Sequence, residues 1–470
     1  MNREDPMKKI VTNKYFYLAI FVIVYFAVRM PFFSLGWDGA DGNGHDTDIF
    51  VNHPQKPNYL LIGRIEGSDI YLPAYGHPAP MYEMVARLGD FFNTFVDLKK
   101  ARNQEIIFGL KLISSLFQLA IFTLVFLTSV KGKKDGDALK KERLLIFGLL
   151  LLSIAPMAIY NNNEFQLDST FGVLMAGLYS ALLLAHDRKV LRGKTLAILF
   201  FISSFFIGLG KNEWNLLFVL ALVSVASYFI VLKYLLKKSE NYNEAFGILL
   251  ISFAGCSIGN LVSYSFEPAH YISGWKLLFS MSQKASILGP SGLKNFVIVS
   301  ALRLPYIVIH LILLSYCTFY VLNMIGRLSL ALILSYLFSF FLFIAFFFST
   351  FAACSRYFAP SFISLVVSSI IVYLTYQNTD DKKTVRAFLI IYGFLFIHTM
   401  SFIGDGALKS RMIFGTGSIT ERPINEECVP LLNVEDVYKN KMDFIHYSMG
   451  YQGGSELAQK YNKRVCRDRP

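Results

Sequence analysis

Long apolar runs dominate the chain, and short polar stretches separate them. Runs such as 144–160 and 328–348 reach the length of a membrane-crossing helix, which needs about 17 to 25 residues. Neither run alternates apolar and polar residues, so the pattern excludes the strands of a transmembrane β-barrel. A window of about 19 residues predicts about eleven helical spans. They lie at 15–33, 106–130, 144–160, 170–185, 196–210, 216–236, 246–264, 302–324, 328–348, 358–376 and 387–402.

The basic residues predict which way the chain crosses the membrane. With a cytoplasmic N-terminus, the inner segments hold 21 Lys and Arg residues and are 1–14, 131–143, 186–195, 233–245, 325–327 and 377–386. The short outer loops 161–169 and 211–215 hold Lys211 alone. Because short cytoplasmic loops carry an excess of Lys and Arg, we expect the N-terminus inside and the C-terminus outside.

The composition supports a membrane protein and argues against two other classes. Of the 470 residues, 54% are hydrophobic and 17% are charged, whereas soluble globular proteins carry about 25% charged residues. A soluble cytosolic enzyme is therefore excluded. The net charge of +12 comes largely from the inner loops, so it does not indicate a nucleic-acid partner. The expected fold is an all-α polytopic bundle in a lipid bilayer.

This topology leaves two large segments outside the membrane, a first outer loop at 34–104 and a tail at 403–470. Within the loop, 80–95 has apolar residues at helical spacing, which predicts a helix lying in the membrane interface. A packed helix of a soluble region is the alternative. In the tail, Cys428 and Cys466 would face an oxidising compartment, where they pair or remain two free thiols. The chain has no CxxC or Cys/His metal spacing.

The first outer loop concentrates carboxylates. Asp38, Asp41, Asp46 and Asp48 lie within eleven residues and are interleaved with glycines. Such acids could bind a divalent cation or act as a general base. The segment lacks the Glu that an EF-hand carries at its twelfth position, and a solvated Asp/Gly turn is the alternative.

Other candidate residues lie at the predicted outer ends of spans. Lys211 is a lone cation between two spans, and Arg356 begins the tenth span. An ionisable residue at membrane depth is by default a candidate for function. Asp168 precedes the fourth span by one or two residues, where it could instead cap the helix, and His77 could be a surface residue. Acids that activate a hydroxyl and cations that hold a phosphate on one face suit transfer from a lipid-phosphate donor.

Four segments resemble the GT-C superfamily of polyprenyl-phosphate-sugar-dependent glycosyltransferases. IAPMAIYNNNEFQLDST resembles the "NP..I..S..WGQ.DS" segment, in which Gln166, Asp168 and Ser169 keep their places and Phe165 replaces Trp-Gly. GLGKNEWNLLF resembles the "LTKPQALLL" turn and retains Lys211. GHPAPMYEM resembles "YPPL.Y", and SRYFAPSFISLVV resembles "RYLLP.LP.L". The resemblance covers most of residues 15–376 and makes 1–402 a GT-C-like catalytic domain.

The resemblance implies an inverting transfer of a sugar from a polyprenyl-phosphate donor to a hydroxyl of a glycan or glycolipid acceptor. The reaction would take place on the outer face of a bacterial inner membrane, or in the ER lumen if the protein is eukaryotic, with a first-loop acid as the base. Asp48 is the first candidate because it precedes the apolar turn 49–51, Asp46 is the second, and Asp38 competes with both. A lipid-phosphate donor requires no metal, although a divalent cation could bridge its phosphate and the acids.

The remaining site residues follow from the same hypothesis. Lys211, Arg356 and His77 would hold the donor phosphate, and Gln166, Asp168 and Glu213 would contact the substrate. Two other functions suit the topology: a polysaccharide polymerase or ligase, which transfers a whole glycan, and a flippase or transporter of lipid-linked glycans. A flippase should place ionisable residues through the midplane of the membrane. Here the charges lie at the outer face, which favours the glycosyltransferase.

Overall fold

The structure is a computed structural model. It describes residues 14–33, 103–131, 137–152, 167–210, 212–236, 242–266, 310–325, 328–347, 359–376, 428–430 and 464–466, together with 268, 271, 272, 275 and 308. Across these ranges the chain is almost wholly helical, and each of the two strands contains three residues. The all-helical fold class predicted from the apolar runs is therefore correct for the part of the chain that the structure describes.

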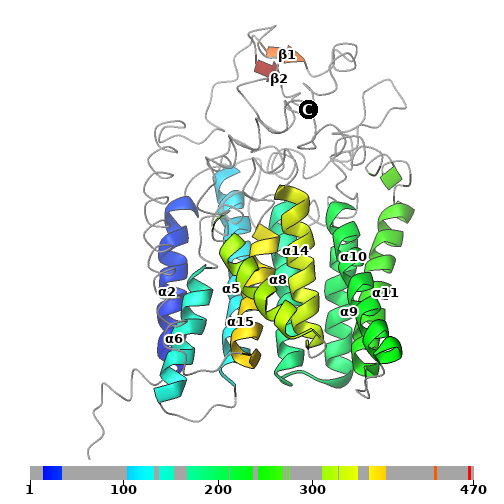
Figure 1. The fold of residues 1–470 in the computed structure, drawn as a ribbon. Coiled ribbons are helices and arrows are strands. Elements are labelled where there is room, and N and C mark those ends of the chain that lie inside the picture. Colours follow the sequence, from blue (N-terminus) through cyan, green and yellow to red (C-terminus); the bar gives the residue numbers. More distant parts are fainter. Residues whose placement is uncertain are drawn as a thin grey trace, which may run out of the picture.

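Figure 1 shows the helices packed side by side as a bundle. The elements are α2 (Lys14–Phe33), α5 (Asn103–Ser129), α6 (Asp137–Leu152), α8 (Leu167–Asp187), α9 (Gly193–Leu209), α10 (Asn212–Ile230), the π-helical turn η2 (Val231–Leu235), α11 (Asn243–Phe266), α14 (Leu330–Phe347), α15 (Ala359–Tyr376), β1 (Cys428–Pro430) and β2 (Arg464–Cys466). A further apolar helix covers His310–Asn323.

Helices coincide with the predicted apolar segments, with one marked difference in a boundary. The third predicted span was placed at 144–160, whereas α6 begins at Asp137. Its charged first turns, DALKKER, consist mostly of residues with high helix propensity, so the helix extends beyond the apolar run. The predicted span 387–402, the interfacial helix 80–95 and the first outer loop 34–104 lie outside the described residues.

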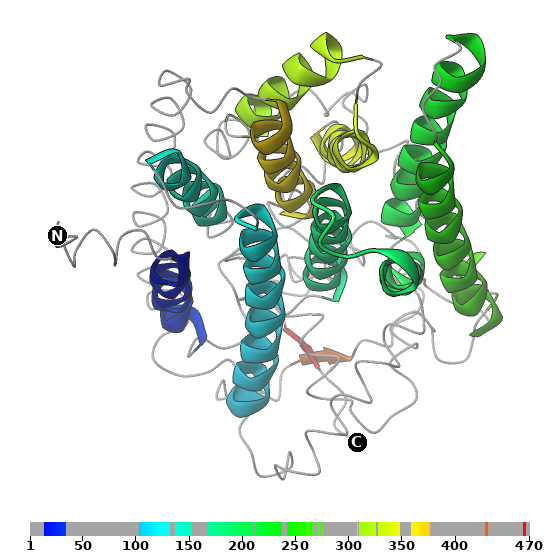
Figure 2. The same cartoon turned by 90° about the horizontal axis from the view of Figure 1, so that it is seen from below.

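Two of the described helices are long and apolar enough to cross a membrane, Trp214–Leu235 and Asn243–Phe266. Both lie at one edge of the bundle, where Figure 2 shows them in green. Their outward side chains are apolar and exposed, as in Leu250 (69% exposed) and Leu261 (60%) of α11. A continuous apolar face of this kind indicates contact with lipid or with another protein.

Close contact between backbones joins α9 to α11. A methyl group added to Gly208 of α9 would overlap the backbone carbonyl of Cys256. On α11, a Cβ at Gly255 would lie 2.6 Å from the carbonyl oxygen of Phe201, and one at Gly259 would overlap the carbonyl of Phe205. Gly255 and Gly259 are four residues apart and therefore share one helix face. This small-xxx-small arrangement lets two helices approach closely without a hydrophobic driving force.

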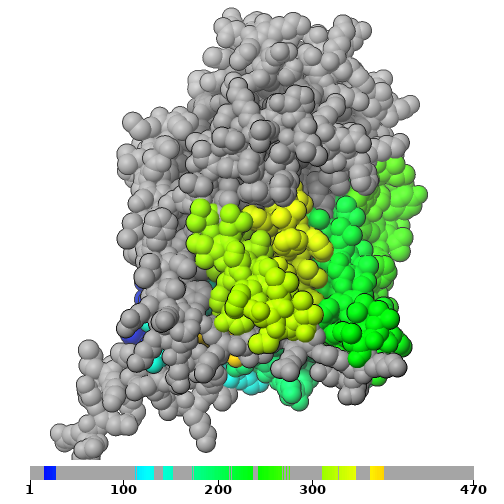
Figure 3. All heavy atoms as spheres, in the orientation of Figure 1, coloured from blue at the N-terminus to red at the C-terminus, as the bar shows by residue number. Residues whose placement is uncertain are grey.

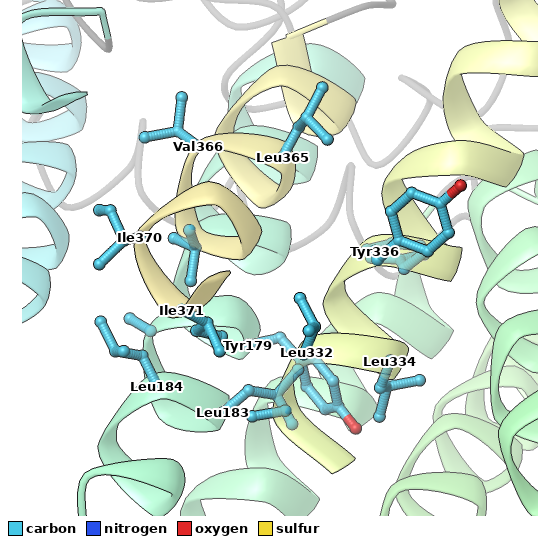
Figure 4. Packing of buried hydrophobic residues seen from close by; sticks show 14 of the residues in the cluster. Tyr179, Leu183, Leu184, Leu332, Leu334, Tyr336, Leu365, Val366, Ile370 and Ile371 are labelled. Atoms are coloured by element: carbon cyan, nitrogen blue, oxygen red, sulfur yellow. The ribbon is translucent and has the colours of Figure 1, made fainter. Parts of the chain in front are cut away.

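The interior of the bundle lies around α8, which packs against α5, α9, α14 and α15. Figure 4 shows Leu183 of α8, Leu332 of α14 and Ile370 of α15 among the side chains that fill this space. All three are buried. On the face drawn in Figure 3, the yellow-green segments between 310 and 347 lie beside the green helices α10 and α11. The two groups meet through Phe218 and Phe338, whose rings are 5.3 Å apart.

Buried serines add hydrogen bonds between the same helices. The hydroxyl of Ser180 on α8 donates to Ser364 on α15 at 3.0 Å. On α15, Ser368 donates to the hydroxyl of Ser335 on α14 at 2.9 Å. Because serine is small and its hydroxyl finds a partner across the interface, these helices pack closely while the serine hydroxyls keep their hydrogen bonds.

The two short strands bring together distant parts of the C-terminal tail. They run parallel, with Cys428 paired to Arg464 and Pro430 paired to Cys466. The two cysteines are therefore offset by two residues, which puts their Cα atoms about 8 Å apart for strands of ordinary geometry. A disulfide usually needs Cα atoms about 4.4 to 6.8 Å apart. This register does not fit the predicted pairing, and it favours the alternative of two free thiols.

Candidate functional site

Most residues of the predicted site lie outside the described part of the chain. These are the candidate bases Asp38, Asp46 and Asp48, the candidate phosphate ligands His77, Lys211 and Arg356, and Gln166. Asp168 and Glu213 lie in helices, and the structure describes their backbone but not their side chains. The site can therefore be built from the helix ends that flank these residues.

Two of the candidate acids occupy the same position in two helices. Asp168 is the second residue of α8, and Glu213 is the second residue of α10. The interpretation of Asp168 as a cap that precedes the helix is therefore wrong, because α8 already begins at Leu167. A carboxylate in the first turn of a helix is favoured by the partial positive charge of the unpaired amide groups there.

Trp214 brings the first turns of these two helices together. The outer edge of its six-membered ring contacts Gly172 of α8 so closely that a methyl group on Gly172 would overlap Cη2 and Cζ3. On its other side, the Cε3 atom lies 3.7 Å from the position that a Cβ of Gly210 would take. The indole is thus wedged between the beginning of α8 and the end of α9. The beginning of α8, the end of α9 and the first turn of α10 consequently lie at one end of the bundle.

Asn215 holds the turn between α9 and α10 in place. Its side-chain Nδ2 donates to the carbonyl oxygens of Gly208 at 3.0 Å and Gly210 at 3.4 Å. These are among the last carbonyls of α9, which have no partner within the helix. A side chain from the next helix therefore caps the end of α9, and Lys211, which follows Gly210 in the sequence, is outside the described residues.

A chain of amide groups extends this turn to α11. Asn215 Nδ2 also donates to Asn260 Oδ1 at 3.2 Å. Tyr271 donates its hydroxyl to the same oxygen at 2.9 Å, and Asn260 Nδ2 donates to the carbonyl of Cys256 at 3.0 Å. Because the network joins three separate segments, it makes this end of α9, α10 and α11 one rigid unit.

Aromatic rings lie beside this network. The ring of Tyr271 meets that of Tyr264 at 5.8 Å and that of Trp275 at 6.3 Å, both in edge-to-face geometry. Tyr264 is exposed, whereas Tyr271 and Trp275 are partly buried. Tyr and Trp are enriched at interfaces, including the membrane interface, where one part of the side chain is apolar and the other meets water.

At the opposite end of α8, α9, α10 and α11, a histidine contacts a glutamate. His186 in the last turn of α8 contacts Glu244 in the first turn of α11, with 3.0 Å between Nε2 and Oε1. The glutamate is exposed, so the pair contributes little to stability. The helices therefore alternate in direction, with Trp214 and Asn260 at one end and the His186–Glu244 pair at the other.

Several residues of the site were not predicted from the sequence. Lys211 and Glu213 were singled out from the sequence. Their neighbours Asn212, Trp214 and Asn215 were not. A signal was present, because the cluster NEWN opens an otherwise apolar helix. Asn260 interrupts an apolar helix in the same way. Its partner could not be read from the sequence, since the two asparagines are 45 residues apart.

Within the described residues there is no group of three His, Cys, Asp or Glu side chains that could hold a metal ion. The predicted first-loop acids are not among those residues, so a divalent cation there remains a prediction. The chain matches no family model, no curated protein and no solved structure.

Proposed function

We propose that this protein is an integral membrane glycosyltransferase. It would transfer a sugar from a polyprenyl-phosphate donor to a hydroxyl group of a glycan or glycolipid acceptor. The reaction would occur at the end of the bundle formed by the beginnings of α8 and α10, on the outer side of a bacterial inner membrane. The resemblance of the local motifs to the GT-C superfamily motivates this proposal.

The contact between Gly172 and Trp214 is the observation that carries the proposal. The two motifs with the strongest resemblance, around Asp168 and around Lys211, are separated in sequence by the whole of α8 and α9. An enzyme that uses both motifs needs them together, and this contact joins the helices that contain them.

The apolar outer faces of α10 and α11 support a place in the lipid bilayer. A lipid-linked donor diffuses in the membrane, so its phosphate arrives at the level of the headgroups. The proposal places about eleven spans in the membrane, with the N-terminus inside and the C-terminus outside. With that orientation, the Lys211 turn lies at the outer headgroup level, where a cation can meet the donor phosphate.

In the proposed mechanism, Asp48 or Asp46 takes the proton of the acceptor hydroxyl while its oxygen attacks the anomeric carbon. The bond from that carbon to the phosphate oxygen breaks, and the polyprenyl phosphate leaves with the bonding electrons. Lys211 and Arg356 would stabilise the charge that grows on this leaving group. Fixed cations at a low-dielectric interface lower the transition state more than the ground state.

The test uses the purified full-length protein in lipid nanodiscs, a radiolabelled polyprenyl-phosphate sugar and an acceptor extract. Lys211→Met should lower turnover by about 10² to 10³-fold, as the removal of one stabilising group in a preorganised site does. Lys194→Met is the matched control, because Lys194 is an exposed lysine in the first turn of α9, at the opposite end of the bundle. Equal turnover in both variants would remove Lys211 from the mechanism.

A second set of variants addresses the base and the alternative functions. Asp46→Asn and Asp48→Asn are compared side by side, with Asp38→Asn as the competitor and EDTA as a separate arm. Loss of about 10² to 10⁴-fold in one variant would identify the general base. Transfer of a preassembled glycan instead of one sugar would indicate the polymerase or ligase. Movement of a labelled lipid-linked glycan across the bilayer without transfer would indicate the flippase.

A further inference from the structure

The first turn of α10 contains three polar atoms that are buried and lack a hydrogen-bond partner. They are Asn212 Oδ1, Trp214 Nε1 and Asn215 Oδ1. Asn212 and Asn215 are each 2% exposed, and Trp214 is 4% exposed. A buried polar atom without a partner is energetically costly, because it has given up its hydrogen bonds to water. Three of them within four consecutive residues therefore call for an explanation beyond folding.

The network around Asn215 determines which atom of its own side-chain amide is the free acceptor. Backbone carbonyls can only accept, so the atom of Asn260 that faces the Cys256 carbonyl is its NH₂ group. Asn260 then presents Oδ1 to Asn215, whose NH₂ group also faces the carbonyls of Gly208 and Gly210. The remaining atom of Asn215 is an oxygen, which is an acceptor. The orientation of this amide thus follows from three carbonyl groups.

Trp214 supplies the complementary group. The six-membered half of its indole is held between Gly172 and Gly210, so the ring cannot turn without displacing a backbone. Its Nε1–H is a donor and has no acceptor capacity. The first turn of α10 therefore offers one donor from Trp214 and two acceptors from Asn212 and Asn215.

This combination selects the chemistry of a ligand. A phosphate or carboxylate has only acceptors to offer and would face two amide oxygens that also accept. A metal cation would suit the oxygens but not the indole N–H. A hydroxyl group both donates and accepts, so neighbouring hydroxyls satisfy all three atoms. The partner with several neutral hydroxyls on one rigid ring is a sugar.

We propose that Asn212, Trp214 and Asn215 form a subsite that binds the hydroxyl groups of a sugar ring. This inference rests on the proposed function and deepens it, because it separates recognition of the sugar from recognition of the phosphate. Lys211, one residue before Asn212, is the candidate for the phosphate. The sugar is either the one carried by the lipid donor or one belonging to the acceptor glycan, and the two sources share the same hydroxyl chemistry.

The chain allows a direct spectroscopic test because it contains three tryptophans, Trp37, Trp214 and Trp275. Trp37→Phe combined with Trp275→Phe leaves Trp214 as the single fluorophore of the full-length protein in nanodiscs. The probes are polyprenyl phosphates carrying glucose, mannose or galactose, the same polyprenyl phosphate without sugar, and a soluble oligosaccharide from the acceptor extract. We expect a saturable change in Trp214 emission with a sugar-bearing probe and none with the sugar-free lipid.

Two variants then test the hydrogen bonds by radioligand binding in the otherwise native sequence. Trp214→Phe keeps an aromatic ring at this position but removes the N–H, and Asn212→Ala removes one acceptor. Each should weaken binding of the sugar-bearing probe by about 5- to 30-fold and leave binding of the sugar-free lipid unchanged. Tyr179→Phe is the control, because its buried hydroxyl already pairs with Ser252 at 2.8 Å and it should bind both probes like the native protein.

The outcomes separate this inference from the proposed function. If the native protein transfers sugar but both variants keep the native preference for sugar-bearing lipid, the subsite is overturned and the glycosyltransferase stands. If Trp214 responds to the soluble oligosaccharide alone, the subsite stands and belongs to the acceptor. If no sugar-bearing probe binds or alters Trp214 emission, the subsite is overturned, and absence of transfer in the same preparation overturns the function as well.

Discussion

The side-chain amide of Asn215 donates a hydrogen bond to Asn260 Oδ1 at 3.2 Å and so ties the beginning of α10 to the second half of α11. The same amide closes the end of α9 through the carbonyl oxygens of Gly208 and Gly210. One polar side chain thus joins the end of α9, the first turn of α10 and α11. The following predictions test this arrangement and the packing around it.

Replacing Asn260 should loosen the turn. Asn260→Leu removes the acceptor shared by Asn215 and Tyr271 and should lower the free energy of unfolding by about 1 to 3 kcal/mol. Tyr271→Phe removes a single hydrogen bond and should cost about 0.5 to 1.5 kcal/mol. Thermal unfolding of both variants in detergent measures the difference. Equal melting temperatures for Asn260→Leu and the native protein would show that the network does not stabilise this end of the bundle.

A methyl group at Gly208 should separate α9 from α11. Gly208→Ala places a Cβ against the carbonyl of Cys256, and a backbone atom cannot move aside as a side chain can. We expect a loss of about 1 to 3 kcal/mol in stability. Gly247→Ala is the matched control on α11, because a Cβ there meets nothing within 4 Å. That control should be neutral or stabilising by up to about 1 kcal/mol, since alanine favours helices.

The contact between α8 and α10 should show as an energetic coupling between two residues. Gly172→Ala pushes against the indole of Trp214 and should be destabilising, whereas the same change combined with Trp214→Phe should cost less than the sum of the two single changes. Residues in contact typically couple by about 0.5 to 3 kcal/mol. A double-mutant cycle from thermal unfolding measures this term, and strict additivity would mean that the two side chains do not share a packing site.

The register of the C-terminal strands predicts which cysteines can be cross-linked. In the native chain, Cys428 and Cys466 should both react with an alkylating reagent without prior reduction, because they are offset by two residues. Combining Pro430→Cys with Cys428→Ser places a cysteine directly opposite Cys466, and mild oxidation should then form a bridge. Mass spectrometry of the tail peptides distinguishes the two. A bridge between Cys428 and Cys466 in the native chain would contradict the observed register.

The sequence alone led to the helices and to part of the site. Long apolar runs predict helices because burial of such side chains outweighs the propensities of single residues, and α9, α11 and α15 lie where those runs lie. The start of α6 was predicted too late in the chain. Its charged first turns are not apolar, but their residues have high helix propensity, so the helix begins at Asp137. Lys211 stood out as a charge between two apolar spans, which is also a local property.

For the part of the chain that the structure describes, the sequence by itself thus determined where the helices lie, and it also determined where the charges lie and which short motifs are present, because these depend on neighbouring residues. The tertiary structure alone decided that Trp214 meets Gly172, that Asn215 meets Asn260, and that Cys428 stands opposite Arg464 instead of Cys466. Such pairs join segments far apart in the chain. Their choice depends on the packing of whole helices and strands against each other, and a pattern of local positions does not contain that information.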